Sequence, residues 1–117
     1  MPRKSNASRL YGDLDLLILR TLQMNEPAHG LGIIDAIHVG SGSELKVDYG
    51  ALYRALYRLD ERRLVKGEWK ISENNRRARF YRLTPAGRKE LKRAQEEWAR
   101  HTQAVGRILG LEGEGAK

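Results

Sequence analysis

The spacing of apolar residues changes twice along this chain, and these changes restrict the fold more than any other feature of the sequence. Apolar residues recur at helical intervals up to residue 59, alternate with other residues between 65 and 71, and follow a heptad from residue 91. A repeat of about 3.6 residues places side chains on one face of a helix, whereas a repeat of two places them on one face of a strand. We therefore expect three helices, a small β-hairpin and a final helix, which is a mainly α fold.

Three helices are expected before the hairpin. The first begins at Asp13 and ends before Pro27, because proline lacks an amide donor and disfavours helix in the residue before it. The second follows His29, which we interpret as a structural residue of the turn, and ends at the glycine and serine residues 40–43. The third begins at Asp48, whose carboxylate can accept hydrogen bonds from the first-turn amides. The apolar stripes of these helices are Leu14, Leu17, Ile18 and Leu22; Ile33, Ile34 and Ile37; and Leu52, Leu56 and Leu59.

The outward face of the third helix differs from an ordinary solvated face of glutamate and lysine. At about 100° per residue, glycine, arginine and tyrosine fall opposite the leucine stripe. Glycine permits close approach, arginine can reach guanine edges or phosphates, and tyrosine can hydrogen-bond phosphate or pack on sugar. Packing at the helix edge is the alternative for Tyr53, and an ion pair with Glu61 is the alternative for Arg58. The candidate DNA-binding residues of this helix are Tyr49, Gly50, Tyr53, Arg54, Tyr57 and Arg58.

A β-hairpin is expected between the third helix and the last one. Residues 65–71 alternate between the two faces of a strand, and a second strand ends with Phe80-Tyr81-Arg82-Leu83. The Asn74-Asn75 pair between them is a turn signal. Trp69, on the first strand, is expected to pack on the domain. Arginines at the tip and on the return strand suit contact with a phosphate backbone, and they are Arg76, Arg77 and Arg79.

The last helix carries a heptad seam longer than a small domain can cover. Thr84 is a suitable N-cap, Pro85 suits the first helical position, and Gly110 ends the helix. A second copy of the chain is the expected cover, so the seam predicts a homodimer. Trp98 can pack in that interface or stack on a planar effector across the dimer. The seam residues are Leu91, Ala94, Trp98, His101, Val105 and Ile108.

Basic charge is concentrated in the middle of the chain. Residues 47–93 hold 14 basic and six acidic residues, which gives this segment a net charge of +8. The net charge of the whole chain is +7, so this segment accounts for all of the excess. A localised excess indicates a docking surface for a polyanion such as double-stranded DNA, and a merely solubilising surface is the alternative.

Composition and spacing exclude several function classes. The 117-residue chain contains no cysteine, which removes disulfides, cysteine nucleophiles and thiolate zinc sites. No apolar run approaches the ~20 residues of a bilayer span, and no signal-peptide pattern opens the chain. No spacing sets a nucleophile beside a base, and no glycine loop suits a phosphate-bearing cofactor. We expect a cytoplasmic protein that is not an enzyme and needs no metal or cofactor.

The order of the expected elements is that of a winged helix-turn-helix followed by a dimerisation helix. We expect a flexible basic arm over residues 1–12, the winged domain over 13–84, the dimerisation helix over 85–110 and a flexible tail over 111–117. The third helix would enter a DNA major groove and the hairpin would flank it. Two copies would place their third helices about 34 Å apart, one turn of the duplex.

Five motifs can be read along the chain: Leu14-Asp15-Leu16-Leu17-Ile18-Leu19, Pro27-Ala28-His29-Gly30, Gly50-Ala51-Leu52-Tyr53-Arg54-Ala55-Leu56-Tyr57-Arg58-Leu59, Gly67-Glu68-Trp69 and Arg79-Phe80-Tyr81-Arg82-Leu83-Thr84-Pro85-Ala86-Gly87. In this order they resemble the motifs of the PadR family of bacterial transcriptional regulators, in its short branch with a single C-terminal helix. The resemblance covers residues 13–109. It implies a homodimer that binds an operator and usually represses neighbouring genes. Some relatives release DNA when a planar small molecule binds near the dimer interface.

Three positions depart from the family pattern. Ala51 stands where relatives often have threonine or serine, so one hydroxyl contact to DNA is absent. Arg54 stands where proline is common, and it can add a base or phosphate contact. Leu31-Gly32 follows His29 where tyrosine and an acidic residue are usual, so the roles of those side chains are not carried over.

Two function hypotheses remain at this stage. The first is a homodimeric, sequence-specific DNA-binding transcriptional regulator that acts as a repressor on a palindromic operator. The second is a non-catalytic protein-interaction module on a winged-helix scaffold, because a fold alone does not define a function. The direction in which the third helix and residues 47–93 face discriminates between the two.

Overall fold

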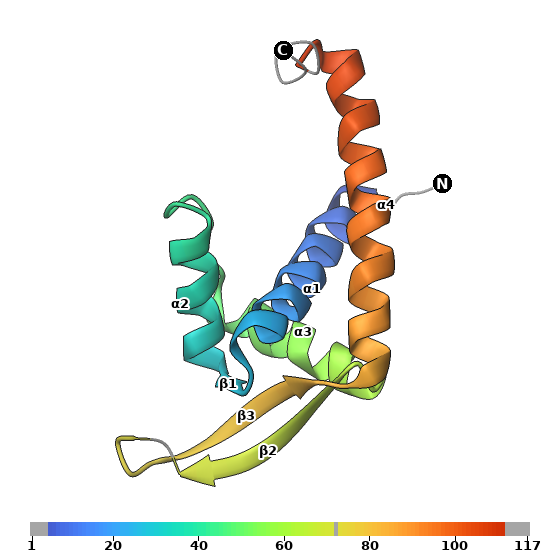
Figure 1. Ribbon diagram of the computed structural model, residues 1–117. Coiled ribbons are helices and arrows are strands. Elements are labelled where there is room, and N and C mark those ends of the chain that lie inside the picture. Colours follow the sequence, from blue (N-terminus) through green and yellow to red (C-terminus); the bar gives the residue numbers. More distant parts are fainter. Residues whose placement is uncertain (1–4, 72, 112–117) are drawn as a thin grey trace.

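The computed structural model describes residues 5–71 and 73–111, and Figure 1 shows how their elements are arranged. These residues form four helices and a three-stranded antiparallel sheet, which confirms the expected mainly α winged fold. Residues 1–4 of the expected arm and 112–117 of the expected tail lie outside the described residues. The elements are α1 (Ser5–Asn25), β1 (Ala28–His29), α2 (Gly30–Gly40), α3 (Tyr49–Glu61), β2 (Val65–Ile71), β3 (Arg77–Leu83) and α4 (Pro85–Leu109).

The first three helices enclose one apolar core, and the expected stripes supply it. Burying one such aliphatic side chain stabilises a fold by about 1.5–3 kcal/mol. Because the leucine stripe of α3 is buried in this core, the opposite face of α3 must point outward. The largest fully buried side chains are Ile18, Leu22, Ile33, Leu52, Leu56, Leu59, Val65 and Leu91.

Side-chain caps begin the helices where the sequence predicts. Asp48 Oδ2 accepts a hydrogen bond from Ala51 N at 3.0 Å, and Thr84 Oγ1 accepts one from Gly87 N at 2.9 Å. His29 caps α2 in the same way, because its Nδ1 accepts from Gly32 N at 3.0 Å. The structural interpretation of this histidine is therefore confirmed.

α1 begins earlier than expected. The helix starts at Ser5 rather than at Asp13, so residues 5–12 are helical and not part of an irregular arm. The apolar pattern begins only at Leu14. Periodicity therefore detects the turns of α1 that pack on the core and misses the turns before them, whose polar residues are compatible with a helix.

The sheet has one strand more than the expected hairpin. β1 pairs with β3, with Ala28 opposite Tyr81 and His29 opposite Phe80, so the strand order is β1-β3-β2. A strand of two residues is too short to show alternation in the sequence. It ties the connection between α1 and α2 to the hairpin, which we call the wing and define as residues 65–83.

α4 extends beyond the rest of the molecule, as Figure 1 shows. Its first turns pack on the core through the buried Leu91, whereas Val105 and Ile108 near its far end are exposed. Gly110 ends the helix with a φ of 78°, in the left-handed region that favours glycine. Within the part of the chain that the structure describes, no helix combines the length and apolarity needed to cross a membrane.

Candidate nucleic-acid interface

The outward face of α3 is exposed as expected. Tyr57 is 66% exposed, and Tyr49, Gly50 and Arg54 also lie in solvent. The cap at Asp48 holds the first turn of this helix. α3 therefore presents, on one accessible face, a glycine backbone without a side chain, a guanidinium and two phenols.

Tyr53 lies at the edge of this face and is partly covered. Its ring meets that of Tyr49 edge-on with centroids 4.9 Å apart. It also packs on α2, because a Cβ added to Gly30 would lie 2.3 Å from the Tyr53 hydroxyl oxygen. Burial and the hydrogen bond with Tyr49 raise the pKa of Tyr53 to about 12. The expected packing at the helix edge is present, and the hydroxyl remains protonated at neutral pH.

Arg58 does not occupy the outward position predicted for it. Its Nη2 lies 2.8 Å from Asp15 Oδ1 on α1, and both side chains are partly buried. The alternative of a pair with Glu61 stays a prediction; Glu61 forms a hydrogen bond with Tyr57, which raises the pKa of that phenol. Burial raises the pKa of Asp15, and the hydrogen bond and charge of Arg58 oppose that rise.

The C-terminal end of α3 is joined by ion pairs to three other elements. Arg58 binds Asp15 of α1, and Asp60 Oδ2 lies 3.8 Å from Arg79 Nη2 of the wing. Arg62, directly after α3, has its Nη2 3.7 Å from Glu90 Oε2 of α4. Arg93 also binds Glu90, at 2.7 Å, and this hydrogen bond lowers the pKa of the Glu90 carboxyl. These contacts restrain one end of α3 and leave its other end accessible.

The wing arginines are exposed or partly exposed. Arg76 and Arg77 lie in solvent near the tip, and Arg79 is partly covered. The expectation that Trp69 packs on the domain is wrong, because this side chain is 55% exposed and the Arg77 Cζ lies 4.7 Å from its ring centre. Alternation in the sequence places Trp69 on one face of the hairpin but does not show whether other elements cover that face.

The heptad seam of α4 divides into a covered and an uncovered part. Leu91 is fully buried in its own chain, so its expected place in a dimer interface is wrong. Ala94 is half-buried, and His101 is exposed. Trp98 is 42% exposed, and its Nε1 donates a hydrogen bond to Asp13 Oδ1 at 3.1 Å. The uncovered part, which we call the open seam, consists of Ala94, Trp98, His101, Val105 and Ile108.

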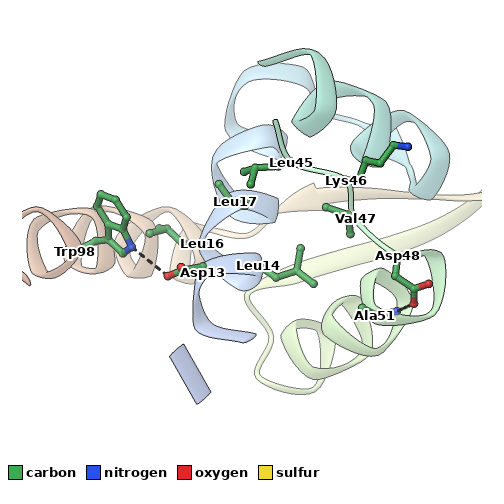
Figure 2. A pocket seen from close by; sticks show the side chains of 10 residues that line it. All are labelled: Asp13, Leu14, Leu16, Leu17, Leu45, Lys46, Val47, Asp48, Ala51 and Trp98. Atoms are coloured by element: carbon green, nitrogen blue, oxygen red, sulfur yellow. Dashed lines mark hydrogen bonds between the residues drawn. The ribbon is translucent and has the colours of Figure 1, made fainter. Parts of the chain in front are cut away.

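Figure 2 shows an open cavity beside this seam, between α1, the segment before α3 and Trp98. Its volume is about 670 Å³, within the range of about 300–1,000 Å³ typical of small-molecule sites. Its walls are mainly apolar, and the Asp13 and Asp48 carboxylates lie at its edge. The residues that line it are Asp13, Leu14, Leu16, Leu17, Leu45, Lys46, Val47, Asp48, Ala51 and Trp98.

Among the residues that the structure describes, no three histidine, aspartate or glutamate side chains gather closely enough to hold a metal ion.

A three-helix core whose third helix exposes one face, followed by a β-hairpin, defines a winged helix-turn-helix protein, which is a DNA-binding class. The sequence model of the transcriptional regulator PadR-like family matches residues 18–93, and the chain belongs to this family. Its members are transcriptional regulators rather than enzymes, which favours the first of the two hypotheses, a transcriptional regulator, over the protein-interaction module.

Solved structures of similar regulators share the fold. A transcriptional regulator from Clostridium thermocellum is 27% identical with a TM-score of 0.75, covering 88% of this chain and 94% of that one. A PadR family regulator from Clostridium difficile is 28% identical with a TM-score of 0.68, covering 82% and 97%. A third, from Eggerthella lenta, is 25% identical with a TM-score of 0.72, covering 91% and 90%. No curated protein matches the chain.

The ion pair between Arg58 and Asp15 gives a testable pH dependence. Arg58→Met removes the group that opposes the effect of burial, so the raised pKa of Asp15 should rise further, as measured by NMR titration of the carboxyl. Between the unfolded and the raised folded pKa, the folded state binds more protons, so stability must fall as the pH rises through that window. At neutral pH we expect the variant to be less stable by on the order of 1 kcal/mol, with partial recovery in acid.

Arg54→Met is the matched control for this experiment. It removes a guanidinium from the same helix but from its solvent-exposed face. The pKa of Asp15 should remain at its wild-type value in this variant. An unchanged Asp15 pKa in Arg58→Met would contradict the proposed opposition between burial and the ion pair.

Proposed function

We propose that this protein is a homodimeric repressor that binds a palindromic operator in double-stranded DNA. The observation that carries the proposal is the exposed face of α3, where Gly50, Arg54 and Tyr57 lie opposite a buried leucine stripe. Its fit to a major groove follows from the close approach that glycine permits and from the base edges that arginine can reach. Because its ligand is chromosomal DNA, the protein acts in the cytoplasm.

α3 and the wing divide the contacts with DNA. Arg54 reads base edges, while the phenols of α3 contact phosphate and sugar. The wing arginines contribute sequence-independent affinity for the backbone. Arg58 has no part in this set, because its guanidinium is bound to α1. The proposed DNA-binding residues are Tyr49, Gly50, Tyr53, Arg54, Tyr57, Arg76, Arg77 and Arg79.

The open seam of α4 supplies the dimer interface. Ile108 is 86% exposed in a single chain, and Trp98 and Val105 are exposed on the same heptad. Covering these side chains with the α4 of a second copy removes apolar surface from water. A two-fold dimer places two α3 helices on one side of the duplex, which matches a palindrome.

A planar small molecule beside Trp98 is the proposed effector. The indole lines a mainly apolar cavity of suitable size, and its Nε1 is held by Asp13. The cavity also reaches Asp48, the cap of α3, so a ligand there touches the helix that binds DNA. Such contact provides the differential interaction that effector-dependent release needs.

Fluorescence tests the effector proposal. The chain has two tryptophans, so Trp69→Phe leaves Trp98 as the single reporter. Titration with acridine or naphthalene should quench Trp98 in a saturable way, because a stacked ring alters the surroundings of the indole. Quenching that rises linearly without saturation would contradict a site.

DNA binding is tested with a duplex selected by this protein from a random pool, using fluorescence anisotropy at several salt concentrations. Arg54→Ala should reduce the binding free energy for the selected duplex by about 1–3 kcal/mol and change the preferred base, because a guanidinium that reads a base edge is lost.

Arg76→Ala should weaken binding to the selected and the random duplexes alike. It should also lower the slope of log affinity against log salt concentration by about 0.9, the value for one phosphate contact. Equal wild-type affinity for selected and random DNA would refute a sequence-specific regulator.

The oligomeric state is tested by sedimentation. Ile108→Glu places a charge in the open seam, so it should shift the protein from dimer to monomer at micromolar concentration and weaken operator binding. Gln103→Glu adds the same charge to α4 away from the heptad, and this control should remain dimeric. A wild-type protein that sediments as a monomer would refute the proposed assembly.

A further inference from the structure

The guanidinium of Arg54 lies back over the first turn of α3, the recognition helix of the proposed function. A Cβ added to Gly50 would lie 3.3 Å from Arg54 Nη1. Gly50 is four residues before Arg54 on the same face of the helix, and long helical side chains point back toward the N-terminus. The guanidinium therefore covers the backbone of Gly50 and ends near the start of the helix.

The start of a helix is an unfavourable place for a cation unless an anion lies beside it. The N-terminus of a helix carries a partial positive charge of about half an elementary charge, which repels a guanidinium. The carboxylate of Asp48 supplies the anion, because its Oδ2 also lies 3.3 Å from the Cβ position of Gly50. Asp48 and Arg54 therefore border the same small space, which glycine leaves open between them.

The carboxylate of Asp48 is fixed independently of Arg54. Its Oδ2 accepts a hydrogen bond from Ala51 N at 3.0 Å, and the backbone carbonyl of Asp48 accepts one from Leu52 N at 2.9 Å. A carboxylate oxygen has two lone pairs, so the cap leaves acceptor capacity for a guanidinium. Asp48 thus offers a fixed negative charge beside an arginine that is exposed to solvent.

We propose that Asp48 is a positioning residue for base reading, which holds the Arg54 guanidinium with its edge donors toward a guanine in the major groove. The proposal rests on the proposed function and deepens it, because it says how Arg54 selects a base. Arginine binds guanine through two hydrogen bonds, to O6 and N7, and this pairing needs one orientation of the planar group. A carboxylate that fixes the orientation beforehand reduces the side-chain freedom lost on binding.

The charge of Asp48 also decides between the two kinds of acceptor that DNA offers to Arg54. Phosphates accept many of the hydrogen bonds that arginine donates to DNA, and these contacts carry no sequence information. A carboxylate beside the guanidinium repels a phosphate, because both are anions. The O6 and N7 acceptors of guanine carry no net charge and meet much weaker repulsion. The pair of Asp48 and Arg54 therefore favours a base edge over the backbone.

The test measures the preference for one base rather than the affinity alone. The full chain selects a duplex from a random pool, and Arg54→Ala identifies the guanine that the arginine reads. A second duplex carries A·T in place of that G·C pair, and anisotropy titrations give the ratio of the two affinities. Asp48→Asn should lower this ratio about tenfold, because the guanidinium is no longer held toward guanine. Its affinity for the A·T duplex should stay the same or rise, since a negative charge is removed.

The variants separate the charge of Asp48 from its role as a cap. Asparagine is as good an N-cap as aspartate, so Asp48→Asn keeps the hydrogen bond to Ala51 N. Asp48→Ser serves the same purpose if circular dichroism shows that Asp48→Asn does not fold. Glu44→Gln is the matched control, because it removes an exposed carboxylate from the same segment before α3. This control should keep the wild-type ratio.

A double-mutant cycle shows whether Asp48 acts through Arg54. In the Arg54→Ala background the guanidinium is absent, so adding Asp48→Asn should leave the ratio of the two affinities unchanged. A loss of preference that is the same with and without Arg54 would overturn the inference, because the carboxylate would then act on the duplex by another route.

The remaining outcomes separate this inference from the function on which it rests. A wild-type protein that prefers its selected duplex, with a folded Asp48→Asn variant that keeps the full preference for guanine, overturns the inference and leaves the repressor proposal intact. An Arg54→Ala variant that changes the preference for no guanine also overturns it, because there is then no reading to position. A wild-type protein without preference for its selected duplex overturns the proposed function, and the role of Asp48 with it.

Discussion

Burial of the leucine stripe of α3 is the interaction on which the rest of this structure depends. Leu52, Leu56 and Leu59 lie in one core with Ile18 and Leu22 of α1 and are almost completely inaccessible. When one stripe of a helix is buried, the opposite stripe must point away from the core. The glycine, arginine and tyrosine face of α3 is therefore exposed as a consequence of packing, and the wing, which follows α3 along the chain, starts from a fixed position.

Some of the basic residues of the middle segment form ion pairs within the molecule, and others remain accessible for a ligand. Arginines near the C-terminal end of α3 pair with acidic residues on α1 and α4, so their charge is partly compensated within the molecule. Exposed pairs of this kind contribute little stability individually, about 0–1 kcal/mol each. Together they fix the position of the recognition helix, because they join three other elements to one end of it. Accessible guanidiniums include that of Arg54, on the outward face of α3, and those of Arg76 and Arg77 on the wing.

Much of the fold could be predicted because its signals are local. Asp48 and Thr84 cap helices by hydrogen bonds to residues three positions away, and Asn75 adopts a φ of 61° in the turn where the asparagine pair predicts one. The candidate site was less predictable. Arg58 pairs with Asp15 over a sequence separation of 43 residues, and no spacing rule for a single helix can find such a partner. Leu91 satisfies the heptad as well as Ile108 does, yet the core of its own chain covers it.

The order of elements, the caps, the face of α3 that meets solvent and the concentration of positive charge are properties of the chain alone, because they follow from residues close together in sequence. The early start of α1, the strand β1, the partner of Arg58 and the exposure of Trp69 required the folded molecule. The last three depend on which distant segments come into contact. Contact between distant segments is set by the packing of the whole core, and a period or a motif carries no information about it.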